Sequence, residues 1–273
     1  MILRIACAAL LLHGFASAQL ERITPPTSPP AVLSTQQATD LRAAFERATF
    51  STPAGTMLPY RMLRPNQATR GRLYPLVIML HGSGQIGTDN NAQLDQLALS
   101  WAQPSMQMQY PAFVAAPQFP ARTANYDVSA DDHLLASHAA APLLPLFDLI
   151  DTLTSSLPVD PGRIYLVGFS MGASGAWQSL LLHPEKFAAG LLLSGVPPER
   201  MLAPRFRELP LLIAHGDADP ENPYGPDLAM AKALGPSSKT RFRTYTGMAH
   251  TVPPDIADPG STWWRDWLFA QHR

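Results

Sequence analysis

The stretch Arg163-Ile-Tyr-Leu-Val-Gly168-Phe-Ser170-Met-Gly172-Ala-Ser-Gly-Ala-Trp177 is the part of the chain that most constrains its fold. Its first residues form an apolar run typical of a buried strand, and residues 173–182 are typical of a buried helix. Glycines stand two residues before and two residues after Ser170, where a strand and a helix approach each other closely. The stretch therefore predicts Ser170 on a sharp strand–turn–helix connection, with its hydroxyl clear of a sheet.

Strands and helices alternate on both sides of this stretch. Strands are expected at 57–63, 76–80, 112–116, 164–169, 189–193, 211–214 and 241–245, and helices at 36–50, 92–102, 143–157, from near 170, 225–234 and 262–271. The run 76–80 is apolar throughout, as expected of a strand that is covered on both faces. This order predicts an α/β fold with a mostly parallel central sheet, helices on both faces and no large lid domain.

The beginning of the chain has the features of a secretory signal. Arg4 precedes the apolar run 5–12, and Ala16-Ser17-Ala18 supplies small residues before a cut ahead of Gln19. The apolar run is too short to span a bilayer, which favours a cleaved signal over a membrane anchor. We expect residues 1–18 to be removed, a Pro-rich, disordered or extended leader at 19–33, and a single domain at 34–273. The protein would then be exported, to the periplasm or beyond it.

The composition disfavours several kinds of site. The only cysteine is Cys7, inside the expected signal, so the mature chain would lack a thiol for catalysis, metal binding or disulfides. The formal net charge is −1 and no basic run occurs, which disfavours nucleic acid and anionic membranes as partners. The unassigned segment 122–140 contains Asp131, Asp132, His133 and His138. A polar loop near the site is favoured there over a metal site, because no known ligand spacing is present.

A serine hydroxyl needs a base that accepts its proton, and the base needs an orienting carboxylate. In this architecture the acid and then the base follow the serine along the chain, on loops after later strands. The loop after 211–214 offers Asp217 and Asp219; we expect Asp219 to orient the base and Asp217 to be structural. His250 follows the last strand and is the expected base. His81 and His215, which end other strands, are expected to brace loops.

The anion formed during attack on a carbonyl carbon needs hydrogen-bond donors that are already in place. The strand 76–80 runs directly into His81-Gly82-Ser83-Gly84, the loop that supplies one backbone N–H in such folds. The residue after the nucleophile supplies the other, so we expect the amides of Ser83 and Met171 as donors. The loop lacks the fingerprint of a phosphate or dinucleotide site, and we expect no cofactor and no metal.

These residues resemble those of the α/β-hydrolase superfamily. More narrowly, the chain is similar to secreted esterases of the phospholipase/carboxylesterase-like and predicted-peptidase types, relatives of polyhydroxyalkanoate depolymerase-type and feruloyl-type esterases. The matching segments are 58–61, 75–84, 87–90, 116–118, 163–172, 175–177, 184–188, 215–216 and 245–250. In that family the acid is the aspartate three residues after the glycine of its loop, which corresponds to Asp219. The position after Gly172 is Ala173, where relatives often repeat glycine.

The resemblance implies a serine hydrolase that cleaves small or polymeric carboxylic esters through an acyl-enzyme. A peptidase of the same fold is one alternative. Such peptidases usually carry a large accessory domain, and only a short segment lies here between the expected leader and the first core strand, so esters are favoured. A non-catalytic binding protein on a hydrolase scaffold is the other alternative. That alternative would predict a missing member of the serine, acid and base set, and Ser170, Asp219 and His250 are all present.

Overall fold

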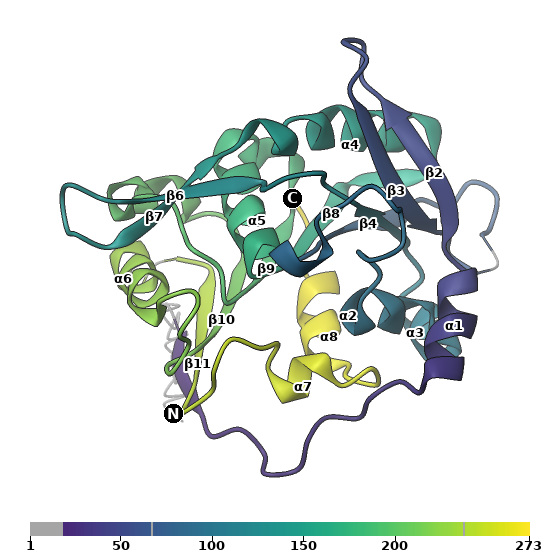
Figure 1. Cartoon of the computed structure of the whole chain (residues 1–273). Helices are drawn as coiled ribbons and strands as arrows, with labels where there is room; N and C mark the ends of the chain where they lie inside the picture. The colour runs from purple at the N-terminus through teal and green to yellow at the C-terminus, as the bar shows by residue number, and fades with distance from the viewer. Residues whose placement is uncertain (1–18, 67, 237) are drawn as a thin grey trace, which may run out of the picture.

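The computed structural model describes residues 19–66, 68–236 and 238–273. Within them, nine strands form one sheet in the order β1-β11-β10-β9-β8-β4-β5-β3-β2 (Figure 1). Neighbours from β1 to β5 in this order are parallel, and β3 and β2 are antiparallel to their neighbours. Their bounds are β1 Gln19–Ile23, β2 Glu46–Ser51, β3 Met57–Leu63, β4 Tyr74–Leu80, β5 Phe113–Pro117, β8 Val159–Phe169, β9 Ala189–Leu193, β10 Leu211–Gly216 and β11 Thr240–Tyr245.

Helices cover both faces of this sheet (Figure 1). One face carries α4 (Pro145–Ser156), α5 (Met171–Leu182) and α6 (Tyr224–Leu234). The other carries α1 (Thr35–Ala43), α2 (Gln96–Leu99), α3 (Pro104–Gln109), α7 (Pro254–Ala257) and α8 (Trp263–Phe269). Strand β4 is apolar throughout because Leu76 and Ile78 enter the core on one face, and Val77 and Met79 enter the core on the other. The described residues thus confirm the predicted α/β fold without a large lid.

Two helix predictions were wrong in part. The helix expected over 36–50 ends at Ala43, and Glu46–Ser51 forms β2 instead, paired with β3. Between them lies a turn at residues 44–45, where Phe45 is buried and its carbonyl accepts a hydrogen bond of 2.7 Å from Arg61. The helix expected over 92–102 begins only at Gln96, after Asp95 caps it, and α3 follows where no helix was predicted.

The segment 122–140 is a β-hairpin rather than a loop. Its strands β6 (Ala124–Val128) and β7 (Leu135–Ala139) pair with each other and stand apart from the main sheet. Hydrogen bonds hold the hairpin against α5: Gln178 donates to the carbonyl (2.8 Å) and the hydroxyl (2.9 Å) of Ser137, and the hydroxyls of Tyr126 and Ser174 lie 2.9 Å apart. The described residues contain no cluster of metal-ligating side chains, here or elsewhere.

Part of the segment 19–33, predicted as a disordered or extended leader, belongs to the main sheet. Gln19–Ile23 form β1, which extends the sheet beside β11 in parallel. The chain then crosses the lower edge of the molecule in Figure 1 before α1 begins. Gln96 fastens this segment: its amide nitrogen donates to the carbonyl of Ala31 (3.0 Å), and its oxygen accepts from the amide of Leu33 (3.0 Å). Residues 19–23 and 31–33 therefore contact the domain that was expected to begin at residue 34.

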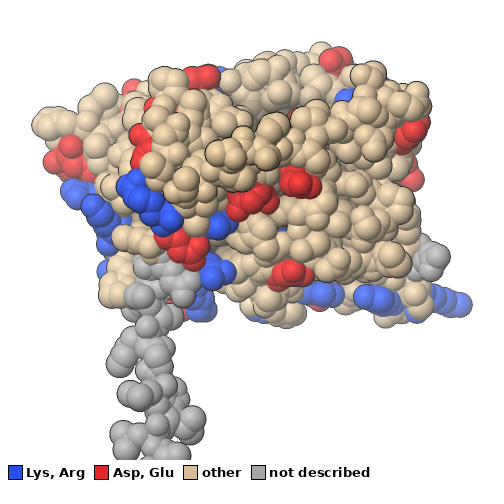
Figure 2. Space-filling model, turned by 90° about the horizontal axis from the view of Figure 1, so that it is seen from below, with Lys and Arg blue, Asp and Glu red and all other residues tan. Residues whose placement is uncertain are grey.

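The predicted signal, residues 1–18, lies outside the described residues. In the part of the chain that the structure describes, no helix combines the length and the apolar character needed to cross a membrane. On the face shown in Figure 2, uncharged residues cover most of the area, and Lys and Arg lie mainly toward its edges.

Candidate active site

Ser170 lies at the sharp connection between β8 and α5, as its sequence predicts. Its backbone adopts φ 56° and ψ −122°, a strained conformation for a residue with a side chain. The flanking glycines are required by close backbone contacts: a Cβ on Gly168 would lie 2.4 Å from the carbonyl oxygen of Gly172, and one on Gly172 would lie 2.0 Å from that of Leu80. The amide of Ser170 donates to the carbonyl of Leu193 (2.8 Å), which ties the turn to the end of β9.

The structure brings Ser170, His250 and Asp219 into one hydrogen-bonded line. His250 Nδ1 lies 2.6 Å from Asp219 Oδ2, and His250 Nε2 lies 2.8 Å from Ser170 Oγ. A carboxylate oxygen can only accept, so Nδ1 carries the proton of the neutral imidazole and Nε2 is free to accept from the serine hydroxyl. The imidazole also packs against the ring of Phe169, with centroids 5.0 Å apart. This geometry can move a proton from the serine to the histidine.

Asp219 is held as a fully buried carboxylate in the loop after β10. Its Oδ1 accepts from the amides of Glu221 (2.8 Å) and Asn222 (3.0 Å), while Oδ2 faces His250. Burial raises the pKa of Asp219, but hydrogen bonds from His215, His250 and the two amides outweigh it and lower the pKa to about 2. The carboxylate therefore stays ionised at neutral pH, and hydrogen bonds to both of its oxygens fix its orientation.

A second histidine contacts the same carboxylate. His215 is fully buried; its Nε2 lies 3.3 Å from Asp219 Oδ2 and 3.0 Å from the carbonyl of Asn222, and its Nδ1 lies 2.8 Å from Asp227 Oδ2. Both neighbours of Nε2 accept hydrogen bonds, so Nε2 carries a proton. Without a second proton, Nδ1 and the Asp227 carboxylate would be two acceptors facing each other at 2.8 Å. A second proton must therefore lie between them, and the His215–Asp227 pair then has no net charge. Sequence reasoning predicted only a loop brace for His215, because its partner Asp227 lies on α6.

The amides of Met171 and Ser83 both stand at the start of a helical turn. Met171 is the first residue of α5, and Ser83 is the first residue of the 3₁₀ helix η1 (Ser83–Gln85). The first N–H groups of a helix have no partner one turn earlier, so both amides can serve an external acceptor. A Cβ placed on Gly82 would lie 3.7 Å from the Cβ of Ser170, so the loop that carries Ser83 lies directly against the nucleophile.

His81 holds this loop in place, as its position at the strand end predicts. Its Nε2 accepts from the amide of Phe119 (3.0 Å), so its Nδ1 carries the proton and donates to the carbonyl of Gly82 (2.7 Å). Burial lowers the pKa of His81, which keeps the imidazole neutral at physiological pH. The loop is therefore fixed before any substrate arrives.

Asp217 has the structural position that the sequence predicts for it. Its Oδ1 accepts from the amide of Gly247 (2.6 Å), and its Oδ2 pairs with Arg22 of β1 (2.6 Å). The Gly247 amide and the Arg22 guanidinium hold the pKa of Asp217 below its ordinary value. Asp217 thus joins the loop after β11 to the N-terminal strand, while Asp219 points to the histidine.

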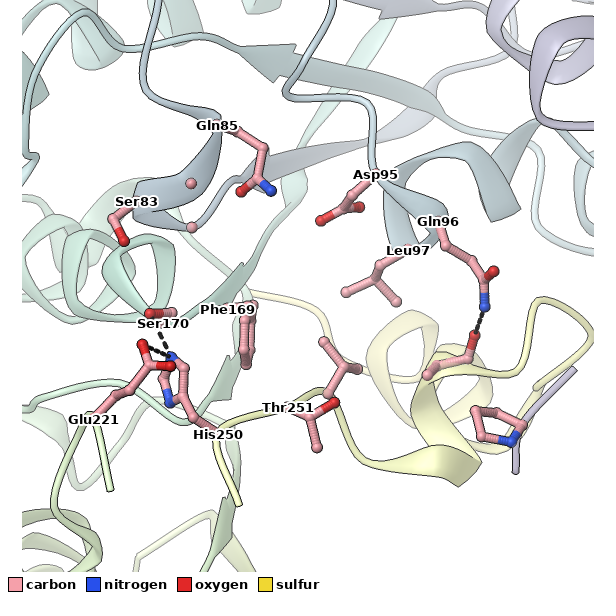
Figure 3. A pocket seen from close by; sticks show the side chains of 15 residues that line it. Ser83, Gln85, Asp95, Gln96, Leu97, Phe169, Ser170, Glu221, His250 and Thr251 are labelled. Atoms are coloured by element: carbon pink, nitrogen blue, oxygen red, sulfur yellow. Dashed lines mark hydrogen bonds and ion pairs between the residues drawn. The ribbon is translucent and has the colours of Figure 1, made fainter. Parts of the chain in front are cut away.

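A pocket of about 380 Å³ opens around Ser170 and His250. Figure 3 shows Ser83 and Ser170 at one end of the drawn site, and Asp95, Gln96 and Leu97 at the other. Pro30 also lines the pocket, so the N-terminal segment forms part of its wall. Sequence reasoning missed Pro30, because the distant Gln96 contacts decide where that segment lies.

The sheet order, the strained serine and the hydrogen-bonded histidine define an α/β-hydrolase. Residues 67–257 match the phospholipase/carboxylesterase family, and the chain therefore belongs to this family. The fold and the family together place it among the carboxylesterase-type serine hydrolases.

Named relatives agree with this class. A probable carboxylesterase of Oryza sativa subsp. japonica is 25% identical over 76% of this chain and 82% of its own length. The putative esterase NocK of Nocardia uniformis subsp. tsuyamanensis is 26% identical over 79% of this chain and 63% of its own length. The crystal structure of a thermostable esterase superposes with a TM-score of 0.76 and 31% identity, covering 85% of this chain. The present chain spans 64% of that esterase.

Proposed function

We propose that the protein is an exported serine esterase that works through an acyl-enzyme. His250 Nε2 takes the proton of Ser170, whose Oγ attacks the ester carbonyl carbon and forms a tetrahedral oxyanion. The amides of Ser83 and Met171 bind that oxyanion. When the carbon–oxygen bond to the alcohol breaks, the imidazolium returns its proton to the leaving alkoxide oxygen. A water molecule then attacks the acyl-Ser170 ester by the same route and releases the acid.

The observation that carries this proposal is the line from Ser170 through His250 to Asp219, with contacts of 2.8 and 2.6 Å. The ionised carboxylate of Asp219 keeps the proton of the imidazole on Nδ1 and stabilises the positive charge that His250 acquires. Ser170 is held in a strained backbone conformation, and the Asp219 carboxylate is buried. Both features cost free energy of folding, and such features cluster at active sites. They therefore favour catalysis over a non-catalytic binding protein.

Export is supported by the sequence of residues 1–18, with cleavage ahead of Gln19. Strand β1 starts at Gln19, which pairs with Arg241 of β11. Cleavage ahead of Gln19 would therefore leave the whole of β1 in the mature protein. Expression of the full chain in a bacterium, followed by N-terminal sequencing of the periplasmic and medium fractions, tests this part. A chain that keeps Met1 and remains in the cytoplasm would contradict export without touching the esterase proposal.

Hydrolysis of 4-nitrophenyl butyrate tests the esterase proposal. The wild type is expected to turn the ester over, and Ser170→Ala is expected to lose at least about 10³-fold in kcat. Circular dichroism should show that the variant keeps its fold, because the serine hydroxyl has no structural partner other than His250 among the described residues. Turnover by Ser170→Ala at the wild-type rate would refute the assignment.

A further inference from the structure

The pocket around Ser170 is lined by two acidic side chains that the hydrolysis itself does not use. Its wall includes the carboxylates of Asp95 and Glu221, and no lysine or arginine of the described residues lines it. Figure 3 shows Glu221 beside Ser170 and His250, and Asp95 on the far side of Phe169. A substrate that reaches Ser170 therefore passes close to the Glu221 carboxylate, which lies beside the nucleophile.

Glu221 lies where the alcohol leaves. Its Oε2 is 3.7 Å from His250 Nε2, the atom that returns the proton to the leaving oxygen in the proposed mechanism. That oxygen must come within hydrogen-bond distance of Nε2, so a charge two or three bonds further along the alcohol comes near Glu221. The Glu221 side chain is 70% exposed, and His250 is its one ionic contact within the described residues. Its charge is therefore available to a substrate.

Asp95 lies on the other side of the pocket, where the acyl group of an ester with its alcohol near Glu221 would lie. Its Oδ1 accepts from the amide of Ala98 and caps α2. Burial raises the pKa of Asp95, against the amides of Ala98 and Leu97, and none of the described lysines or arginines pairs with it. An anionic acyl group would meet this wall without a lysine or arginine of the described residues to balance its charge. The neighbouring Leu97, Phe169 and Val252 offer apolar surface instead.

We propose that this pocket selects esters by charge: it prefers an alcohol that carries an ammonium group, accepts neutral esters, and discriminates against esters that carry a carboxylate or phosphate. The inference rests on the proposed esterase function and names its substrate class. Glu221 is the specificity-determining residue on the alcohol side, and Asp95 disfavours anionic acyl groups. Because Glu221 is exposed, the preference for a cation is about twofold to fivefold at low ionic strength, and salt screens it.

A matched pair of substrates tests the alcohol side. Butyrylcholine and 3,3-dimethylbutyl butyrate have the same shape and differ in a quaternary nitrogen against a carbon. Their kcat/KM values, measured by pH-stat titration in low salt, are expected to differ about threefold in favour of the cation. The ratio should fall toward one in high salt, and Glu221→Gln should lower it in low salt. Glu208→Gln is the matched control, because Glu208 is 88% exposed and does not line the pocket.

The acyl side is tested with mono-4-nitrophenyl succinate against 4-nitrophenyl butyrate. The wild type should hydrolyse the anionic ester more slowly, and Asp95→Asn should narrow the gap while the asparagine still caps α2. A cation ratio of one in the wild type, or the same ratio in Glu221→Gln, would overturn the inference while hydrolysis of the neutral esters still supported the esterase. Failure of the wild type on every ester would instead refute the proposed function.

Discussion

His215 Nε2 lies 3.3 Å from Asp219 Oδ2, the same oxygen that His250 Nδ1 contacts at 2.6 Å. The carboxylate that orients the proposed base is therefore itself oriented by a second, fully buried histidine. Asp227 balances that histidine from α6 at 2.8 Å. The line of hydrogen bonds that begins at Ser170 thus continues past Asp219 into the core, through His215 to Asp227.

Replacing His215 should separate the folding role of this line from its role in catalysis. His215→Leu leaves Asp227 buried and unpaired, which should lower the free energy of unfolding by about 3 kcal/mol. The double variant His215→Leu/Asp227→Leu removes both polar groups and should recover most of that loss. Its kcat/KM should still be reduced about tenfold, because Asp219 lacks one of its charge-assisted donors. Urea denaturation and ester hydrolysis measure the two effects. Full activity in the double variant would show that His215 does not position Asp219.

The His215–Asp227 pair should also make stability fall as pH rises. Burial lowers the pKa of His215, but hydrogen bonds to Asp219 and Asp227 outweigh it and raise the pKa to about 9. Below about pH 6.5 the folded and unfolded states both hold this proton, and between that value and the raised pKa only the folded state does. Its contribution is therefore complete at low pH and lost through this window, by at most about 1.4 kcal/mol per pH unit.

The control for this pH effect is Asp227→Asn. An asparagine amide can donate to Nδ1 of a neutral His215, so the variant needs no shared proton. Urea denaturation at pH 6, 7, 8 and 9 should therefore give a flatter profile for Asp227→Asn than for the wild type. Equal slopes would show that the pair does not gain a proton on folding.

The two aspartates of the loop after β10 should behave differently. Asp219→Ala removes the orienting carboxylate and should lower kcat/KM by about 10³-fold or more. Asp217→Asn should change kcat/KM by no more than about threefold, because Asp217 contacts Arg22 and Gly247 rather than His250. Steady-state kinetics with 4-nitrophenyl butyrate compares the two variants. The reverse order of effects would assign the acid to Asp217.

The elbow should tolerate no side chain at Gly172. In Gly172→Ala the new Cβ would lie 2.0 Å from the carbonyl oxygen of Leu80, so β4 and α5 would have to move apart. We expect a loss of more than about 3 kcal/mol in the free energy of unfolding, or no soluble protein. Gly225→Ala is the matched control in α6, since its Cβ would meet no atom closer than 3.9 Å. A melting temperature for Gly172→Ala equal to that of Gly225→Ala would contradict the close contact.

The elbow was predictable from sequence because its requirements are local. Gly168 and Gly172 flank Ser170 within five residues, and the apolar runs on either side identify the strand and the helix. The order of acid and base along the chain then pointed to Asp219 and His250. The structure places His250 against the serine and Asp219 against His250. The position of the loop 81–84 beside Ser170 was predictable by the same logic, since its strand, β4, runs directly into it.

The misassigned regions depend on distant partners. The apolar spacing of α1 continues past Ala43, but pairing with β3 makes Glu46–Ser51 a strand. β1 is an edge strand whose partner β11 lies more than 200 residues later along the chain. The contact of His215 with Asp219 also depends on Asp227, a residue of α6. Local periodicity carries no information about such partners.

The central claim is that Ser170 is the nucleophile that His250 and Asp219 activate. Its most direct test is labelling with a fluorophosphonate, followed by mass spectrometry of the intact protein and of its peptides. We predict one adduct per chain, on Ser170, with labelling much slower in Asp219→Ala and no adduct in Ser170→Ala. An unlabelled wild-type protein, or an adduct on a different residue, would contradict the account.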